Sequence, residues 1–198
     1  MKIFALEGLP CSGKSTFMNR FNLEHPEFEC VPELYIEATA NNDLHSVQDK
    51  YARAEIDKYQ KYGKCTKDVL FDRSIFSTLA FSYAKLLTFG EGEEYEFHKK
   101  FIENHKELII PNYIFVLNIT PAESIARRKK AIRDNTLDFW FNEDYLMNFS
   151  QYYISSDIYK LINKESVFLF ETQQADKSAV YDAIRAQISA VRGELGKI

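Results

Sequence analysis

Short apolar runs alternate with amphipathic stretches along the chain. The apolar runs, several of them rich in β-branched and aromatic residues, predict strands over residues 2–7, 28–33, 69–72, 113–119 and 167–170. Between them, apolar residues recur at helical spacing, which predicts helices from about Lys14 and over roughly 46–62, 75–88, 93–108 and 176–192, one opened by Thr120 and Pro121, and a long aromatic one over roughly 140–163. Strands that alternate with helices indicate an α/β fold, with a parallel sheet covered on both faces.

A glycine-rich loop joins the first predicted strand to the first helix. Gly8, Gly13, Lys14 and Ser15 match the phosphate-binding pattern G-x-x-x-x-G-K-[ST] at every fixed position. The glycines let backbone N–H groups turn toward one anion, and the helix adds the positive end of its dipole. Lys14 can reach the β- and γ-phosphates, and the Ser15 hydroxyl can ligate Mg²⁺. The other loop residues expected to contact the nucleotide are Pro10, Cys11, Ser12 and Thr16. A glycine turn with a surface lysine is the alternative, but the flanking strand and helix favour a site for ATP.

Polar residues follow two other predicted strands. Asp72 comes after three apolar residues, as does an acid that holds Mg²⁺, although it could simply end its strand in a turn. Arg73 can clamp a transferring phosphoryl group, because a guanidinium bonds two oxygens at once. Glu33 is the candidate general base for a hydroxyl acceptor, or else a helix cap or an indirect metal partner. Ligands of open α/β sheets bind at the carboxyl ends of strands, so these residues are expected in one cleft.

Three segments resemble known kinases. Residues 7–16 look like the opening of thymidylate kinases. Residues 72–81 are similar to the D-R-[YS]-x-x-S segment of thymidylate and deoxynucleoside kinases, and residues 31–33 resemble the strand-two acid of deoxynucleoside kinases, whose glutamate deprotonates the sugar 5′-hydroxyl. The resemblance implies a P-loop three-layer sandwich with a five-stranded parallel sheet. It also implies a single domain over 1–198 with a small lid over roughly 127–140.

The resemblance assigns roles by position. Lys14 and Ser15 would handle phosphate and Mg²⁺, Glu33 would be the base, Asp72 a metal partner and Arg73 the clamp. Three further arginines enter by resemblance, Arg53 as a contact to the acceptor base and Arg127 or Arg128 as lid residues near the ATP. The basic cluster at 127–133 could otherwise be a solvated helix face. Leu34 and Ser74 stand where these families often have proline and tyrosine, so the acceptor stays open between a nucleoside, a nucleotide and another metabolite.

Aromatic side chains are further candidate contacts, whereas the histidines are not. Four aromatic residues on segments that should border the cleft could stack on a base: Tyr35, Tyr51, Phe76 and Tyr83. The four histidines show no metal-ligand spacing and are expected on surface helices or loops.

Composition limits the classes of partner. The 198-residue chain is 45% hydrophobic and 27% charged, with a net charge of −4 and a pI near 5.7, which disfavours a dedicated binder of duplex nucleic acid. Three cysteines without metal spacing fit a reducing compartment. The early Glu7 and Gly8 do not fit a signal peptide, and no apolar run is long enough for a bilayer, so a cytoplasmic protein without membrane contact is expected. Pairing through surface helices, common in this fold, would give a homodimer.

Together these features predict ATP-dependent phosphoryl transfer to a nucleoside or nucleoside monophosphate, with a deoxy, pyrimidine-like acceptor favoured. A kinase of a sugar or antibiotic and a partner-binding ATPase are the alternatives. A GTP-dependent switch is disfavoured, because residues 118–121 lack the N-K-x-D guanine signature.

Overall fold

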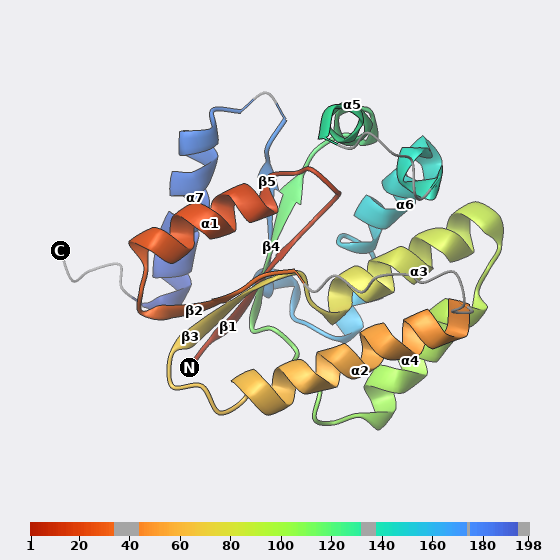
Figure 1. Cartoon of the computed structure of the whole chain (residues 1–198), viewed down its shortest axis with the longest axis horizontal. Coiled ribbons are helices and arrows are strands. Elements are labelled where there is room, and N and C mark those ends of the chain that lie inside the picture. The colour runs from red at the N-terminus through yellow and green to blue at the C-terminus, as the bar shows by residue number, and fades with distance from the viewer. Residues whose placement is uncertain (34–43, 132–137, 174, 194–198) are drawn as a thin grey trace.

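One five-stranded sheet lies at the centre of the protein, in a computed structural model that describes residues 1–33, 44–131, 138–173 and 175–193 (Figure 1). The strands are β1 (Ile3–Glu7), β2 (Phe28–Val31), β3 (Asp68–Asp72), β4 (Tyr113–Asn118) and β5 (Val167–Glu171). They are all parallel, in the order β2-β3-β1-β4-β5. The predicted fold class and its five strands are confirmed.

Helices cover both faces of this sheet (Figure 1). They are α1 (Lys14–Glu24), α2 (Leu44–Tyr62), α3 (Ile75–Phe89), α4 (Glu93–Asn104), α5 (Pro121–Ala131), α6 (Glu143–Tyr152) and α7 (Lys177–Arg192). Three short 3₁₀ helices are η1 (Asp138–Phe141), η2 (Ile158–Lys160) and η3 (Lys164–Ser166). Helices α1 and α7 pack on one face, and α3, α4 and α6 lie on the other (Figure 1).

The core follows from the alternation of side chains along each strand. Phe4 and Leu6 of β1 point toward α1 and α7, where they pack with Phe21 and Ile184 in one buried cluster. Ala5 points the other way, into a separate buried cluster. Burying one such large apolar side chain contributes roughly 1.5–3 kcal/mol, so these two layers hold the sheet and both sets of helices together.

Strand register brings the carboxyl ends of β1, β2 and β3 to the same edge of the sheet. Leu6 pairs with Asp72, and Val31 pairs with Phe71. Glu7, Asp72 and the chain that leads from Val31 to Glu33 therefore end side by side. This edge carries the site described below.

The predicted long helix over 140–163 is wrong. The structure instead has η1, then α6, then η2. Asn142 interrupts the segment because its side chain accepts a hydrogen bond from the backbone N–H of Tyr145 at 3.0 Å and so starts a new helix. After Tyr152, the Ser155 hydroxyl donates to the Tyr152 carbonyl oxygen at 2.7 Å and competes with the helical hydrogen bonds.

Two smaller expectations also change. Helix α4 ends at Asn104 rather than near residue 108, and the segment after it turns back with Leu108 N–H donating to His105 O at 3.2 Å. His98 is fully buried instead of lying on the surface, with Nδ1 3.1 Å from the Ser82 Oγ.

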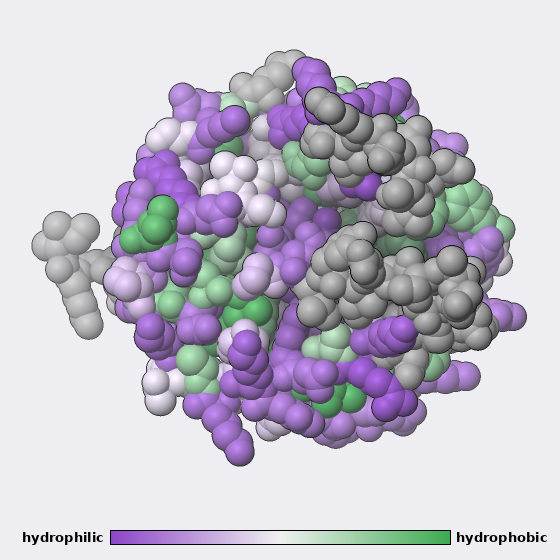
Figure 2. Space-filling model, in the orientation of Figure 1, coloured by the Kyte–Doolittle hydropathy of each residue, from purple (hydrophilic) through white to green (hydrophobic). Residues whose placement is uncertain are grey.

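The outer surface is largely polar. Figure 2 shows hydrophilic side chains over much of the face where α1, α2 and α7 lie, with apolar ones scattered among them. Within the described ranges, no helix has both the length and the apolar character that crossing a bilayer requires.

Candidate active site

The loop after β1 turns sharply at its two glycines. Gly8 has φ +122°, and a Cβ there would lie 2.4 Å from the Leu117 carbonyl oxygen of β4. Gly13, with φ +106°, precedes the first residue of α1. Cys11 between them also has positive φ, +58°. Only glycine fits at position 8, so the close approach of the loop to β4 depends on it.

Side chains from elsewhere bind the outer carbonyl groups of the loop. Ser124 Oγ donates to Pro10 O at 2.7 Å, and Arg127 Nη1 donates to Cys11 O at 3.2 Å. Thr172 Oγ1 donates to Ser12 O at 3.2 Å. These bonds from α5 and the end of β5 hold three carbonyl oxygens toward protein rather than toward an anion, which suits a phosphate cradle.

Lys14 lies inside the curve of this loop. Its Nζ donates to Leu9 O at 2.9 Å, to Gly8 O at 3.2 Å and to Ser12 Oγ at 3.3 Å. Lys14 is only 4% exposed, and burial lowers the pKa of its ammonium to about 8. Among the described residues no carboxylate forms an ion pair with this buried cation, and a bound polyphosphate would supply that opposite charge.

Asp72 and Ser15 form the candidate metal site. Ser15 Oγ donates to Asp72 Oδ2 at 3.0 Å, while Asp72 Oδ1 is buried and has no hydrogen-bond partner within the described residues. Burial raises the pKa of Asp72. No cluster of three or more His, Cys, Asp or Glu side chains in the described ranges could hold a metal alone. One carboxylate and one hydroxyl, with an unsatisfied oxygen, instead fit a Mg²⁺ ion whose other ligands are water and phosphate.

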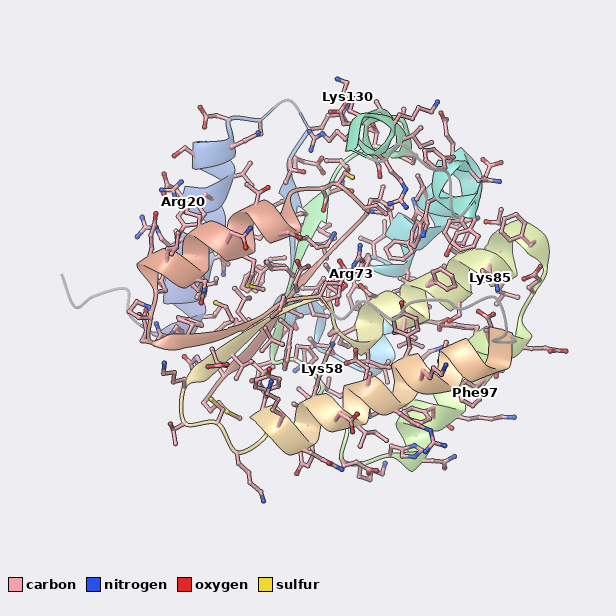
Figure 3. The ribbon with its side chains drawn as sticks, in the orientation of Figure 1. Arg20, Lys58, Arg73, Lys85, Phe97 and Lys130 are labelled. Carbon is pink, nitrogen blue, oxygen red and sulfur yellow. The ribbon has the colours of Figure 1, made fainter. Side chains whose placement is uncertain are left out.

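Arg73 joins the ends of three strands. Its Nε lies 2.6 Å from Glu33 Oε1, and its Nη1 donates to Gly8 O at 3.2 Å and to Ser77 Oγ at 3.0 Å. Figure 3 shows Arg73 near the centre of the molecule, beside the start of α3. Its backbone has φ +70°, a conformation that is strained for a side chain with Cβ and is found mostly at sites where the surroundings enforce it. The structure thus brings together Lys14, Ser15, Glu33, Asp72 and Arg73.

Glu7 is a residue at this edge that the motif reading did not select. It is fully buried and accepts hydrogen bonds from Ser74 N at 2.9 Å, Ser74 Oγ at 2.6 Å and Tyr153 OH at 2.9 Å, and also from Ser77 Oγ. An acid at the end of an otherwise apolar strand was the signal that could have found it.

The other residues predicted to contact nucleotide or acceptor differ in their exposure. Tyr51 and Arg53 lie on α2, half-buried and exposed respectively. Phe76 is fully buried in the core cluster around α3 and α6, so it is not open to a stacking base as expected. Arg128 lies over the Phe141 ring at 5.7 Å, and its buried Nε lacks a partner within the described part of the chain. Tyr35 and residues 132–137 of the expected lid lie outside the described residues.

Tyr83 is half-buried, and its ring lies 5.5 Å from those of Tyr95 and Tyr152. These contacts place it in the aromatic packing between α3, α4 and α6.

A pocket of about 370 Å³ opens beside the loop. Loop residues Ser12 and Gly13 line one side, with Arg127 of α5, Thr172 after β5 and Tyr181 of α7 on the others. Its size is suitable for a small ligand. Sequence reasoning did not predict this pocket, because its walls come from segments far apart in the chain.

Comparison with known proteins gives matches in structure. No family model and no curated protein sequence matches the chain. A structure of deoxyadenosine kinase from M. mycoides with the products dCMP and a flexible dCDP bound is 18% identical, covering 95% of this chain and 99% of that chain with a TM-score of 0.68. A structure of the same enzyme with bound dATP is 15% identical over 94% and 99% of the two chains, with a TM-score of 0.69.

Thymidylate kinase from Candida albicans is also similar. It is 13% identical, and the match covers 96% of this chain and 92% of that chain with a TM-score of 0.72. These matches cover nearly all of this chain and nearly all of each matched chain. The chain therefore has the P-loop kinase fold that deoxyadenosine kinase and thymidylate kinase share.

Proposed function

We propose that the protein transfers the γ-phosphoryl group of ATP to a small acceptor, a nucleoside or nucleoside monophosphate. One observation carries the proposal: a phosphate loop, a candidate Mg²⁺ pair and an arginine–glutamate pair lie at one edge of the sheet. Phosphoryl transfer depends mainly on positioning and on neutralising charge, and this set of residues supplies both.

The donor would lie along the loop and in the adjoining pocket. The triphosphate would bind the loop from Gly8 to Thr16, with Lys14 on its β- and γ-phosphates, and the base would enter the 370 Å³ pocket that Arg127 and Thr172 line. Arg128, on the same helix, would approach the nucleotide from α5. Ser15 and Asp72 would hold Mg²⁺, which neutralises phosphate charge when bound.

The acceptor would bind at Glu33 and Arg73. The side chain of Glu33 is 47% exposed, so its carboxylate can still meet an incoming hydroxyl while Arg73 orients it through Oε1. Glu33 would take the hydroxyl proton as the oxygen bonds to the γ-phosphorus, and the bond from that phosphorus to the β,γ-bridging oxygen of ATP would break, releasing ADP. Arg73 would balance negative charge on the phosphoryl oxygens.

The relatives suggest which acceptors to try first. The deoxyadenosine kinase structures hold dCMP with dCDP, dATP or dCTP, so deoxynucleosides are the leading candidates. The thymidylate kinase match makes a deoxynucleoside monophosphate the second candidate. Arg53 and Tyr51 on α2 would then contact the acceptor base, together with Tyr35.

The test is release of ADP from Mg·ATP in the presence of deoxynucleosides, deoxynucleoside monophosphates, sugars and aminoglycosides. We expect release that depends on a nucleoside or nucleotide and is lost in Lys14→Ala. If ADP is released only with a sugar or an aminoglycoside, the acceptor is that class of molecule and not a nucleoside or nucleotide. Slow hydrolysis that no small molecule stimulates would contradict the kinase proposal and favour a partner-binding ATPase.

A further inference from the structure

Glu7 sits at the end of β1 in an unusual position for an acid. It is fully buried, and within the described residues its carboxylate only accepts hydrogen bonds. The Ser74 amide and hydroxyl donate to Oε1, and the Tyr153 and Ser77 hydroxyls donate to Oε2. Four donors match the accepting capacity of an ionised carboxylate. No lysine or arginine in the described ranges forms an ion pair with it at 4.0 Å or less.

A buried carboxylate of this kind is not explained by a gain in stability, because removing it from water is energetically costly. Burial accordingly raises the pKa of Glu7, and the hydrogen bonds from Ser74 and Ser77 act in the opposite direction. The position of the acid therefore calls for another explanation.

Both ends of Arg73 are connected to Glu7. On the backbone side, Glu7 Oε1 holds the N–H of Ser74, the residue directly after the left-handed turn at Arg73. On the side-chain side, Ser77 Oγ donates its proton to Glu7 Oε2 and so presents its lone pairs to Arg73 Nη1 at 3.0 Å. Because the hydroxyl has only one proton, the bond to Glu7 sets its orientation.

We propose that Glu7 is a positioning residue for the arginine clamp, a role that rests on the proposed kinase function. Through Ser74 and Ser77 it fixes the guanidinium of Arg73, so that Nε stays within ion-pair distance of Glu33 and Nη1 remains at the phosphate loop. Tyr153, which follows α6, donates to the second oxygen of the same carboxylate and connects this network to the end of α6.

The first test is a double-mutant cycle between Glu7→Gln and Arg73→Ala. Misplacing a reacting group by about 1 Å can cost on the order of a hundredfold, so Glu7→Gln is expected to lower kcat by roughly ten- to a hundredfold with little change in KM for ATP. In the Arg73→Ala background the same change should cost less than about threefold, because its target is gone. A full loss in both backgrounds would overturn the proposal.

Ser77→Ala keeps the proposal testable if Glu7→Gln does not fold. It breaks the link between Glu7 and Arg73 while leaving the other donors of the carboxylate in place, and it should show the same non-additivity with Arg73→Ala. Tyr153→Phe and Tyr95→Phe form a matched pair, since each removes the hydroxyl of a buried tyrosine that donates to a carboxylate, at 2.9 Å and 2.7 Å respectively. We expect only Tyr153→Phe to lower kcat; equal effects of the pair would count against positioning.

A second readout separates this proposal from the kinase assignment. The ¹⁵N–¹H signal of Arg73 Nε, identified by its loss in Arg73→Ala, reports on the order of the guanidinium without catalysis. We expect it to shift or broaden in Glu7→Gln and Ser77→Ala and to be unchanged in Tyr95→Phe. An unaltered signal in Glu7→Gln would overturn positioning, whereas absent phosphoryl transfer in the wild type with the expected spectra would contradict only the kinase assignment.

Discussion

The proposed phosphate side and the proposed acceptor side of the candidate site differ in how far they are enclosed. The phosphate side is the enclosed side, and the acceptor side is the open side. On the phosphate side, Glu7, Asp72 and Lys14 are 0%, 3% and 4% exposed, and hydrogen bonds from several elements hold the loop. On the acceptor side, the side chain of Glu33 is 47% exposed and Arg53 is also exposed. Arg73 is the residue that both sides share.

This difference suits the two tasks of the proposed transfer. A phosphate cradle works best when its donors are fixed before the ligand arrives, since reorganisation then costs little at the moment of reaction. A base must instead remain reachable for an acceptor that enters and leaves. Changes on the enclosed side should therefore affect every acceptor alike, and changes on the open side should depend on which acceptor is used.

The largest expected effect is that of Lys14→Ala. Loss of the buried ammonium should lower kcat/KM for ATP by about a thousandfold or more with any acceptor, because the phosphates lose their nearest cation. Steady-state kinetics measures this. Lys85→Ala is the matched control, since Lys85 is also buried, at 6% exposed, but pairs with Glu94 at 2.7 Å on the α3–α4 side (Figure 3).

Glu33→Gln should have the next largest effect, and it should depend on the acceptor. With a hydroxyl acceptor, kcat should fall by about a hundred- to a thousandfold with little change in KM for ATP, as for loss of a general base. Glu27→Gln is the matched control, because its side chain is equally 47% exposed and also neighbours an arginine. Unimpaired transfer to a monophosphate would identify a phosphate acceptor, which needs no base.

Gly8→Ala tests the close packing of the enclosed side. A Cβ there would meet Leu117 O at 2.4 Å with φ at +122°, so unfolding free energy should fall by roughly 3 kcal/mol, combining strain and overlap. Gly90→Ala has positive φ, +77°, but nothing within 4 Å of the added Cβ, and should cost about 1 kcal/mol. Denaturant titration measures the free energy of unfolding of both variants. Equal losses would mean that the loop moves to accommodate the added Cβ, which would contradict the prediction.

His98 is a buried titratable residue that lies away from the candidate site, and it has the smallest expected effect. Burial lowers its pKa to about 4, below the value near 6.5 of an unfolded chain. As the pH falls, the unfolded state therefore takes up a proton before the folded state does. The free energy of unfolding keeps its full value above pH 6.5 and decreases as the pH falls toward 4, by about 2 kcal/mol at pH 5. Denaturant titrations of the wild type and His98→Gln should diverge by this amount between pH 7 and pH 5; parallel curves would contradict it.

The sequence was sufficient for the fold and for the loop, because both depend on local patterns. Strand alternation and the spacing of Gly8, Gly13 and Lys14 are visible without knowing any long-range contact. The edge where Asp72, Arg73 and Glu33 meet also followed from a general rule of parallel sheets.

Other features depend on packing between distant segments and could not be read in this way. The hydrogen bonds of the Glu7 carboxylate include one from Tyr153, a residue far along the chain, and Phe76 is buried because α6 covers α3. The break at Asn142 depends on a single side-chain hydrogen bond within an otherwise aromatic, helix-like stretch. His98 is polar, and its burial depends on packing between α3 and α4: Nδ1 contacts the Ser82 hydroxyl, while Nε2 has no hydrogen-bond partner among the described residues.

The most direct test of phosphoryl transfer from the enclosed side to the open side is a single-turnover experiment. ATP labelled in its γ-phosphoryl group would be mixed with excess enzyme, Mg²⁺ and a deoxynucleoside, and the reaction stopped at intervals. We expect the label to appear in the acceptor, much more slowly in Glu33→Gln and more slowly still in Lys14→Ala. Label that appears only as inorganic phosphate, at a rate independent of nucleosides and monophosphates alike, would contradict it.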